Sequence, residues 1–136
     1  TATAIQGTRR RLPHRHDLRE INFGAWELRR FDDVESEDPH LIRAYWETPG
    51  EIEPPGGESW NAVRARVDAA IDTLIATHQG ADLIVVVHFG VILTQIQRAG
   101  GLSSNEAFSH RINNLSVTEI TRLSQGWRTG RINHVP

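Results

Sequence analysis

The run of residues 83–90, Leu-Ile-Val-Val-Val-His-Phe-Gly, constrains the fold of this chain more than any other segment. Its first five residues are apolar and four of them are β-branched, which is typical of a strand buried on both faces of a sheet. His88 and Gly90 end the run, and apolar residues at helical spacing follow. The segment therefore predicts a strand that delivers His88 to the first turn of a helix.

A side chain at such a junction lies beside free backbone N–H groups and the positive end of the helix dipole. These groups favour an anion, phosphate above all. Strand–turn–helix junctions are common in α/β proteins, so the run also fits a core strand that carries a histidine at its solvent-exposed end. Residues 83–90 by themselves leave both interpretations open.

The other elements follow from periodicity and capping residues. Ser59 is a suitable N-cap for a long helix that ends at Gly80 and repeats apolar residues every three or four positions. Helices that alternate with strands predict an α/β fold, a three-layer sandwich with a mostly parallel sheet and helices on both faces. The remaining expected elements are helices at residues 1–7, 37–47, 90–98 and 103–108, and strands at residues 114–123 and 127–132.

Size and composition exclude several classes of protein. A chain of 136 residues has the size of one domain, so we treat residues 1–136 as a single domain. The formal net charge of −2 argues against a dedicated nucleic-acid binder, which is usually strongly basic. No apolar run approaches the ~18 residues that a membrane span needs, and the chain has no cysteine for disulfides or thiolate chemistry. We expect a cytoplasmic protein.

Three segments stand in a definite order along the chain. Residues 18–27 read Leu-Arg-Glu-Ile-Asn-Phe-Gly-Ala-Trp-Glu, residues 57–59 read Gly-Glu-Ser, and residues 85–90 read Val-Val-Val-His-Phe-Gly. In this order and spacing the segments resemble the histidine phosphatase superfamily, the group of cofactor-dependent phosphoglycerate mutases and α-ribazole phosphatases. Residues 113–120 are similar to a late strand of that family. The resemblance covers nearly the whole chain, is closest to the α-ribazole phosphatases, and implies a phosphoglycerate mutase-like fold.

The resemblance implies a specific chemistry. In the family, a nucleophilic histidine in an Arg-His-Gly motif takes the phosphoryl group. Two arginines and a second histidine hold its oxygens, and a glutamate protonates the leaving oxygen. Matched by motif, the second histidine is His88 and the glutamate is Glu20. Within the same motifs, Asn22, Phe89 and Gly90 are expected to contact the substrate, and no metal or cofactor is expected.

The residue types also suit phosphate ester chemistry on physical grounds. A covalent phosphoenzyme divides a difficult hydrolysis into two easier steps, and positive groups meet the charge on the equatorial oxygens. The leaving oxygen needs a proton, which a carboxyl beside a phosphate dianion can supply. The alternative for Glu20 is an exposed loop charge, with Glu27 and Glu58 as runner-up carboxylates. We expect Glu58 to be structural, and Arg66 to form a salt bridge or orient a loop rather than bind phosphate.

The 136 residues contain no Arg-His-Gly motif. Arg15-His16-Asp17 is the nearest sequence, but no apolar strand precedes it, so we do not expect His16 to be the nucleophile. We expect the chain to lack the first strand of the family fold, to be part of a longer phosphatase, and to form no phosphohistidine by itself. A sheet that lacks a central strand is open to another chain, which predicts aggregation or a homodimer.

Three functions remain open at this point. The first is hydrolysis of a small-molecule phosphate ester, and the second is phosphoglycerate mutase-type phosphoryl transfer. The short connection between Trp26 and Gly57 leaves little room for a large lid, which favours hydrolysis. The third is a non-catalytic module that binds phosphate without a nucleophile. Nucleic-acid binding through the basic residues 9–16 is less favoured than all three.

Overall fold

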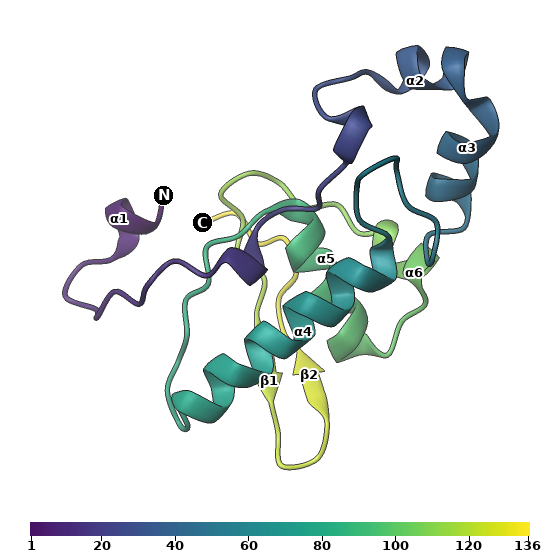
Figure 1. The fold of residues 1–136 in the computed structure, drawn as a ribbon. Helices are drawn as coiled ribbons and strands as arrows, with labels where there is room; N and C mark the ends of the chain where they lie inside the picture. The colour runs from purple at the N-terminus through teal and green to yellow at the C-terminus, as the bar shows by residue number, and fades with distance from the viewer.

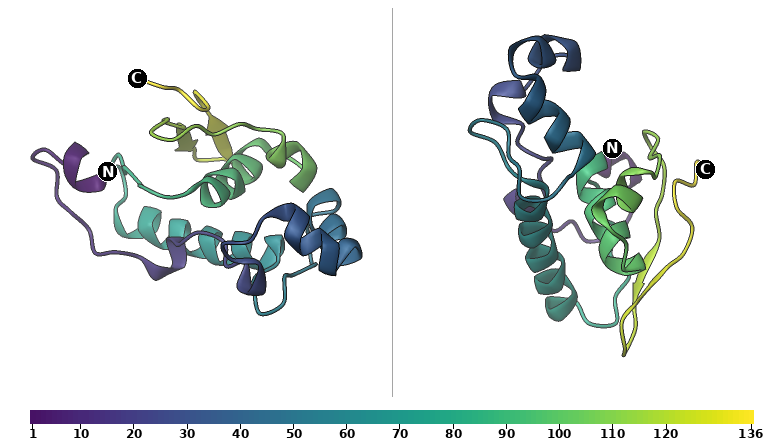
Figure 2. Two further views of the ribbon diagram at one scale, coloured as in Figure 1. Left: turned by 90° about the horizontal axis from the view of Figure 1, so that it is seen from above. Right: turned by 90° about the vertical axis from the view of Figure 1, so that its right-hand side faces the viewer.

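Two helices form the centre of the molecule in the computed structural model, which describes residues 1–136. Helix α4 (Trp60–Thr77) lies against α5 (Phe89–Gly100), and the hairpin of β1 (Ile120–Arg122) and β2 (Trp127–Thr129) packs on α5 from the other side. Figure 1 shows this arrangement, and the view from above in Figure 2 places α5 between α4 and the hairpin. The helix α6 (Ser104–Phe108) continues from α5 and stays in contact with it.

The mostly parallel sheet expected from the sequence is wrong for these residues. The structure has one sheet, in which β1 and β2 run antiparallel with Ile120 opposite Thr129 and Arg122 opposite Trp127. An isolated bridge between Val117 and His134 extends the hairpin. The three-layer sandwich is accordingly replaced by two helices and a hairpin. Between residues 114 and 132, the predicted strands are shorter than expected but fall in the predicted places.

Residues 83–87 are not a strand, although their sequence has strong strand preference. They run as an extended connection from α4 to α5, and no backbone hydrogen bond involves residues 82–87. Ile84 is 58% exposed, and Val85 and Val86 are also exposed. The physical reason is that a strand requires a hydrogen-bonded neighbour, and no segment of the described chain lies alongside to supply one.

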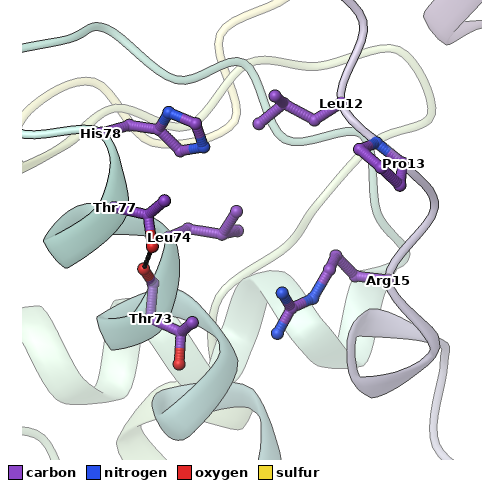
Figure 3. Close-up of a pocket in the computed structure, with 7 residues that line it drawn as sticks. All are labelled: Leu12, Pro13, Arg15, Thr73, Leu74, Thr77 and His78. Carbon is purple, nitrogen blue, oxygen red and sulfur yellow. Dashed lines mark hydrogen bonds between the residues drawn. The ribbon is translucent and has the colours of Figure 1, made fainter.

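A groove of about 680 Å³ runs beside this connection, bounded by residues 81–88 on one wall and residues 9–15 on the other. Residues 10–14 likewise make no backbone hydrogen bonds. Both walls of the groove therefore carry unpaired backbone N–H and C=O groups. A smaller cavity of about 150 Å³ opens next to it, between the segment before the helical turn η1 (His16–Leu18) and the last turns of α4 (Figure 3). Its lining residues are Leu12, Pro13, Arg15, Thr73, Leu74, Thr77 and His78.

The helices confirm most of the predictions made from capping residues. Ser59 accepts a hydrogen bond from the Ala62 N–H at the start of α4, as expected of an N-cap. Ser103 and Glu106 form a reciprocal capping box on α6. The other predicted helices are α1 (Ala2–Ile5) and α3 (Pro39–Glu47). Not predicted were α2 (Phe31–Glu37) and the short helical turns η1 (His16–Leu18) and η2 (Gly24–Trp26).

The buried residues form two clusters. The larger one joins α4, α5 and the segment after η1, and the smaller one joins η2, α2 and α3. Trp60 is fully buried and donates its indole N–H to the Gln97 side chain at 2.8 Å, which links α4 to α5. None of the helices combines the length and the apolar character that a membrane crossing requires.

Candidate active site

Glu20 lies at the N-terminal end of α5, next to the position of His88. One carboxylate oxygen of Glu20 accepts the Gly90 N–H at 3.1 Å, and the other accepts the N–H of Ile21 at 3.0 Å. His88 is the N-cap residue of α5 and is exposed to solvent. Glu20 and Gly90 are 70 residues apart in the sequence. The structure therefore brings the segments of the two predicted catalytic residues to one place on the surface.

Gly90 provides the space that the Glu20 carboxylate occupies. A Cβ atom at position 90 would lie 2.6 Å from Oε1 of Glu20 and 2.8 Å from Cδ1 of Ile21, closer than such atoms can approach. The sequence suggested that backbone N–H groups in the first turn of this helix bind an anion. In this structure the Gly90 N–H donates its hydrogen bond to the Glu20 carboxylate. The first turn of α5 thus accepts negative charge, as helix N-termini do.

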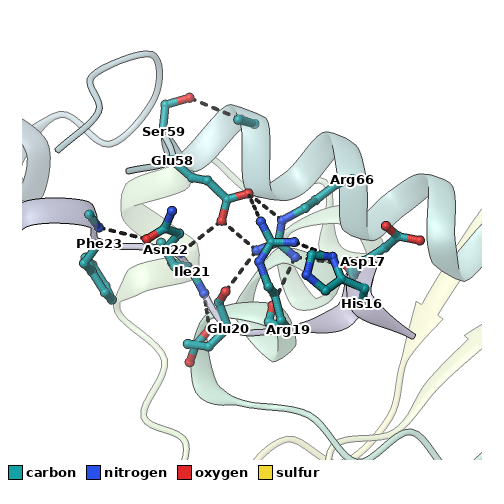
Figure 4. A network of polar contacts seen from close by, with 12 residues as sticks. His16, Asp17, Arg19, Glu20, Ile21, Asn22, Phe23, Glu58, Ser59 and Arg66 are labelled. Carbon is teal, nitrogen blue, oxygen red and sulfur yellow. Dashed lines mark hydrogen bonds and ion pairs between the residues drawn. The ribbon is translucent and has the colours of Figure 1, made fainter. Parts of the chain in front are cut away.

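The Arg66 side chain holds the chain that carries Glu20, as Figure 4 shows. From α4, its guanidinium donates to three backbone carbonyl oxygens: Asp17 at 2.9 Å, Arg19 at 3.0 Å and Glu20 at 3.1 Å. Arg66 also forms two hydrogen bonds with the Glu58 carboxylate, at 2.7 Å and 2.9 Å. The expectation that Arg66 forms a salt bridge and orients a loop is confirmed.

Glu58 completes this network from the position just before the N-cap of α4. Its carboxylate accepts the Asn22 N–H at 2.9 Å, and its own N–H donates to the Asn22 carbonyl at 2.8 Å. The hydrogen bonds from Arg66 hold the pKa of the Glu58 carboxyl below its ordinary value, and the Asn22 N–H and the Arg66 and Arg19 charges add to the effect. Glu58 is therefore ionised at neutral pH and has the structural place expected for it.

The Asn22 side chain faces the neighbouring turn rather than the N-terminus of α5. Its Oδ1 accepts the Gly24 N–H at 2.9 Å, and its Nδ2 is 3.4 Å from the carbonyl oxygen of Gly56. The predicted substrate contact of Asn22 stays a prediction, and so does that of Phe89, which is 43% exposed in the first turn of α5.

Tyr45 is a residue of this region that the sequence analysis did not select. It is buried between Phe23 and Trp26, and its hydroxyl has no hydrogen-bond partner. Burial, assisted by the negative charges of Glu58 and Glu20, raises the pKa of Tyr45 to about 12. The phenol is therefore neutral at physiological pH. In the sequence Tyr45 resembles any core residue of an amphipathic helix, so no signal distinguishes it.

The remaining candidates form no second site. His16 is exposed on η1, and its Nδ1 lies 3.0 Å from a guanidinium nitrogen of Arg19. No group of three or more histidine, aspartate or glutamate side chains is placed to hold a metal ion. Glu27, the other runner-up carboxylate, accepts the Phe23 N–H and so closes the turn at η2.

Comparison with known proteins decides the family. Residues 1–135 match the sequence model of the family described as the histidine phosphatase superfamily (branch 1). The chain belongs to the histidine phosphatase superfamily. The resemblance inferred from the three sequence segments is thereby confirmed.

Two curated relatives and one solved structure illustrate what the chain is similar to. The bifunctional protein Rv2228c of Mycobacterium tuberculosis is 43% identical over 72 residues, which are 53% of this chain and 20% of that protein. The adenosylcobalamin/α-ribazole phosphatase of Salmonella typhimurium is 33% identical over 82 residues, 60% of this chain and 41% of that enzyme. The crystal structure of α-ribazole phosphatase from Shigella flexneri matches with a TM-score of 0.80 and 25% identity, over 97% of this chain and 66% of that one.

These comparisons also define how much of its relatives the chain spans. It covers less than half of the two curated relatives, 20% and 41% of their lengths. The structural match nevertheless includes almost all of its residues. The helices and hairpin described above are therefore arranged as in a phosphoglycerate mutase-like fold, although the paired sheet of these residues is small.

Proposed function

We propose that this histidine phosphatase chain contributes to the hydrolysis of a small phosphomonoester through a phosphohistidine intermediate. Glu20 is the proton donor, and His88 holds phosphoryl oxygens together with the first turn of α5. One observation carries the proposal: the Glu20 carboxylate lies on the Gly90 N–H, at the helix end whose N-cap is His88. A proton donor and an anion-binding helix terminus are thus adjacent, as transfer of a phosphoryl group requires.

The first chemical step forms an N–P bond and breaks the ester P–O bond. A histidine nitrogen attacks phosphorus, and the electron pair of the broken bond goes to the leaving oxygen. In its protonated form, Glu20 gives its proton to that oxygen, so that an alcohol leaves. His88 and the dipole of α5 offset the negative charge on the equatorial oxygens.

The second step returns the site to its starting state. A water molecule attacks phosphorus while Glu20, now ionised, removes a proton from the water. The N–P bond breaks, the electron pair returns to the histidine, and inorganic phosphate leaves. The same carboxyl therefore serves as acid and then as base. Its two oxygens accept the N–H groups of Ile21 and Gly90, which keep the carboxyl at the N-terminal end of α5 in both steps.

We propose none of the histidines in these 136 residues as the attacking histidine, because the residues contain no Arg-His-Gly motif. We propose that residues beyond the 136 supply it, and that these residues alone form no phosphohistidine. Incubation with a radioactive phosphate ester, followed by acid treatment, tests this. Acid-labile label on His16 or His88 of the 136-residue chain would overturn it.

Hydrolysis is preferred over mutase-type transfer because the segment that separates η2 from α4 is short. It forms only α2, α3 and the turn that precedes Ser59, which leaves little chain to enclose an intermediate. The relevant measurement is the release of inorganic phosphate, compared with isomerisation of a phosphoglycerate by the same protein. Isomerisation faster than release would favour the mutase function.

Substitution of Glu20 tests the role of the proton donor in the protein as its gene encodes it. Glu20→Gln should lower kcat/KM on a phosphate ester with an alkyl alcohol leaving group, such as β-glycerophosphate, by about 10²-fold or more. It should lower kcat/KM on p-nitrophenyl phosphate much less, because p-nitrophenolate leaves without a proton and kcat/KM does not include the later hydrolysis of the phosphohistidine. Glu27→Gln is the matched control and should leave both rates within about threefold, since Glu27 only closes a turn. Equal losses on both substrates would exclude Glu20 as the acid.

A further inference from the structure

We propose that Arg66 and Glu58 form a positioning pair, which sets the backbone of residues 17–22 so that the Glu20 carboxylate reaches the N-terminus of α5. The inference deepens the proposed function and rests on it, because it concerns the placement of the proposed proton donor. Neither residue touches the reacting atoms. Both act through the backbone on either side of Glu20.

The guanidinium of Arg66 is used to its full capacity. It has five N–H donors, and the structure contains five hydrogen bonds from it: two to the Glu58 carboxylate and three to carbonyl oxygens. The carbonyls belong to residues 17, 19 and 20, so they converge on one point from both sides of a bend. A backbone bent in this way leaves its carbonyls without helical or strand partners, and a fork of fixed donors satisfies them together.

Glu58 fixes the same segment at its other end. Its carboxylate accepts the Asn22 N–H, and its backbone N–H donates to the Asn22 carbonyl. Arg66 therefore holds the residues that lead into Glu20, and Glu58 holds the residue two positions after it. Both side chains of the pair are only 15% exposed, so solvent competes weakly for these contacts. The direction of the Glu20 side chain follows from a backbone that is fixed before and after it.

A second ion pair between the central helices provides a comparison. Arg98 of α5 makes two hydrogen bonds to Asp72 of α4, at 2.7 Å and 2.8 Å, and one to the carbonyl oxygen of Asp68. It forms no hydrogen bond or ion pair with residues 17–22, and its guanidinium carbon lies 4.5 Å from the centre of the Trp127 ring. Arg98 thus has the charge, the bidentate geometry and the helix-to-helix location of Arg66 without its contacts near Glu20, and it is the matched control.

Substitution by lysine separates the positioning role from simple stabilisation. Arg66→Lys keeps a positive charge beside Glu58, but a single ammonium with three donors cannot reach three carbonyls and a carboxylate at once. Arg98→Lys makes the equivalent change in the control pair. Glu58→Gln is the complementary variant, because it keeps the size of the side chain and removes its charge.

Nuclear magnetic resonance of the protein as its gene encodes it measures the placement of Glu20 directly. In the parent chain, the amide proton resonances of Ile21 and Gly90 should be shifted by their hydrogen bonds to the carboxylate, and comparison with Glu20→Gln should identify that shift. Arg66→Lys and Glu58→Gln should move both resonances in the direction of Glu20→Gln and speed their hydrogen exchange by roughly tenfold. Arg98→Lys should leave both resonances in place, and urea unfolding shows how much stability each variant loses.

The outcomes separate the positioning role from the proposed function. Unchanged Ile21 and Gly90 resonances in Arg66→Lys and Glu58→Gln would overturn the positioning role, even if both variants were less stable. A shift in all three variants, Arg98→Lys included, would assign the effect to general loosening and would overturn it as well. If the resonances respond as expected but Glu20→Gln hydrolyses every ester normally, the pair still positions Glu20, and the proposed proton donor is wrong.

Discussion

At position 90, the absence of a side chain decides what can approach helix α5. The Glu20 carboxylate lies where a Cβ would stand, so a glycine and a glutamate 70 residues apart are coupled by volume as well as by a hydrogen bond. Around them, Arg66 and Glu58 satisfy backbone groups that regular secondary structure would otherwise pair. The site is therefore specified by a few residues whose neighbours are mostly backbone atoms.

A methyl group at position 90 should displace the Glu20 carboxylate. Gly90→Ala is expected to lower the free energy of unfolding by about 1–3 kcal/mol through overpacking. In the protein as its gene encodes it, kcat on β-glycerophosphate should fall by more than about tenfold. Gly50→Ala is the control, because the nearest atoms to its Cβ lie 3.9 Å away. Wild-type kinetics in Gly90→Ala would show that Glu20 need not stay at this position.

The ionisation of Glu58 should make stability depend on pH at the acid side. Its pKa is lowered from the ordinary 4.5 in the folded chain, so the folded state binds this proton less readily than the unfolded chain. The stabilisation is therefore fully present above about 4.5 and is lost as the pH falls through the lower folded value.

Urea unfolding of the parent chain and Glu58→Gln at pH 7 and pH 3 tests this dependence. The glutamine variant should be less stable at pH 7 by about 1–3 kcal/mol, and the difference should shrink at pH 3. A difference that stays constant between the two pH values would show that the charge of Glu58 does not contribute.

Among the elements, the helices depend on local signals and the strand does not. Ser59 and Ser103 each cap a helix through a neighbour three residues away, so the sequence predicted both helix starts. Residues 83–87 have the composition of a strand, but a strand also needs a partner that local sequence does not reveal. The predicted sheet failed for that reason, while the hairpin of β1 and β2, whose partners are near in sequence, was found.

The same distinction applies to the site. Glu20, His88 and Gly90 belong to motifs and were selected by family resemblance, and the structure brings their segments together. The three carbonyl groups that Arg66 binds could not be predicted from residue types, because the backbone carbonyl is the same in every residue. Tyr45 was missed since a buried tyrosine fits the apolar stripe of α3 like any core residue.

The N-cap of α4 should affect both the helix and the position of Glu58, which precedes it directly. Ser59→Ala removes the acceptor for the Ala62 N–H and should cost about 1 kcal/mol of unfolding free energy. Ser59→Asp keeps an acceptor and should recover part of that loss at neutral pH. Thermal unfolding of the three chains provides the comparison, and equal stability of Ser59→Ala and the parent would show that the cap contributes nothing.

For the molecule as a whole, the groove between residues 9–15 and 81–88 is a region with few backbone hydrogen bonds. Its walls carry unpaired backbone groups, and one wall exposes Ile84, Val85 and Val86 to solvent. Strand edges in this state attract other extended chains. The small sheet does not supply hydrogen-bond partners for these backbone groups, because β1 and β2 pair only with each other.

We expect the 136-residue chain to self-associate through this region. Sedimentation velocity over a range of protein concentrations should show species larger than the 15.3 kDa monomer. Val85→Lys, which places a charge on the exposed wall, should shift the distribution towards monomer. Val135→Lys changes another exposed valine away from the groove and should have no effect. A monomer at every concentration would contradict the expectation.

The segment that carries Glu20 reaches α5 across a long arm, residues 6–23, whose regular structure is limited to the single turn of η1. Because this arm is fastened mainly by Arg66, Glu58 and the buried Leu18 and Ile21, we expect it to detach more readily than α4 and α5 unfold. Tryptic cleavage after Arg19, whose carbonyl oxygen accepts a hydrogen bond from Arg66 while the arm is attached, would report such detachment. Resistance to the protease thus becomes a measure of how often the acid is in place.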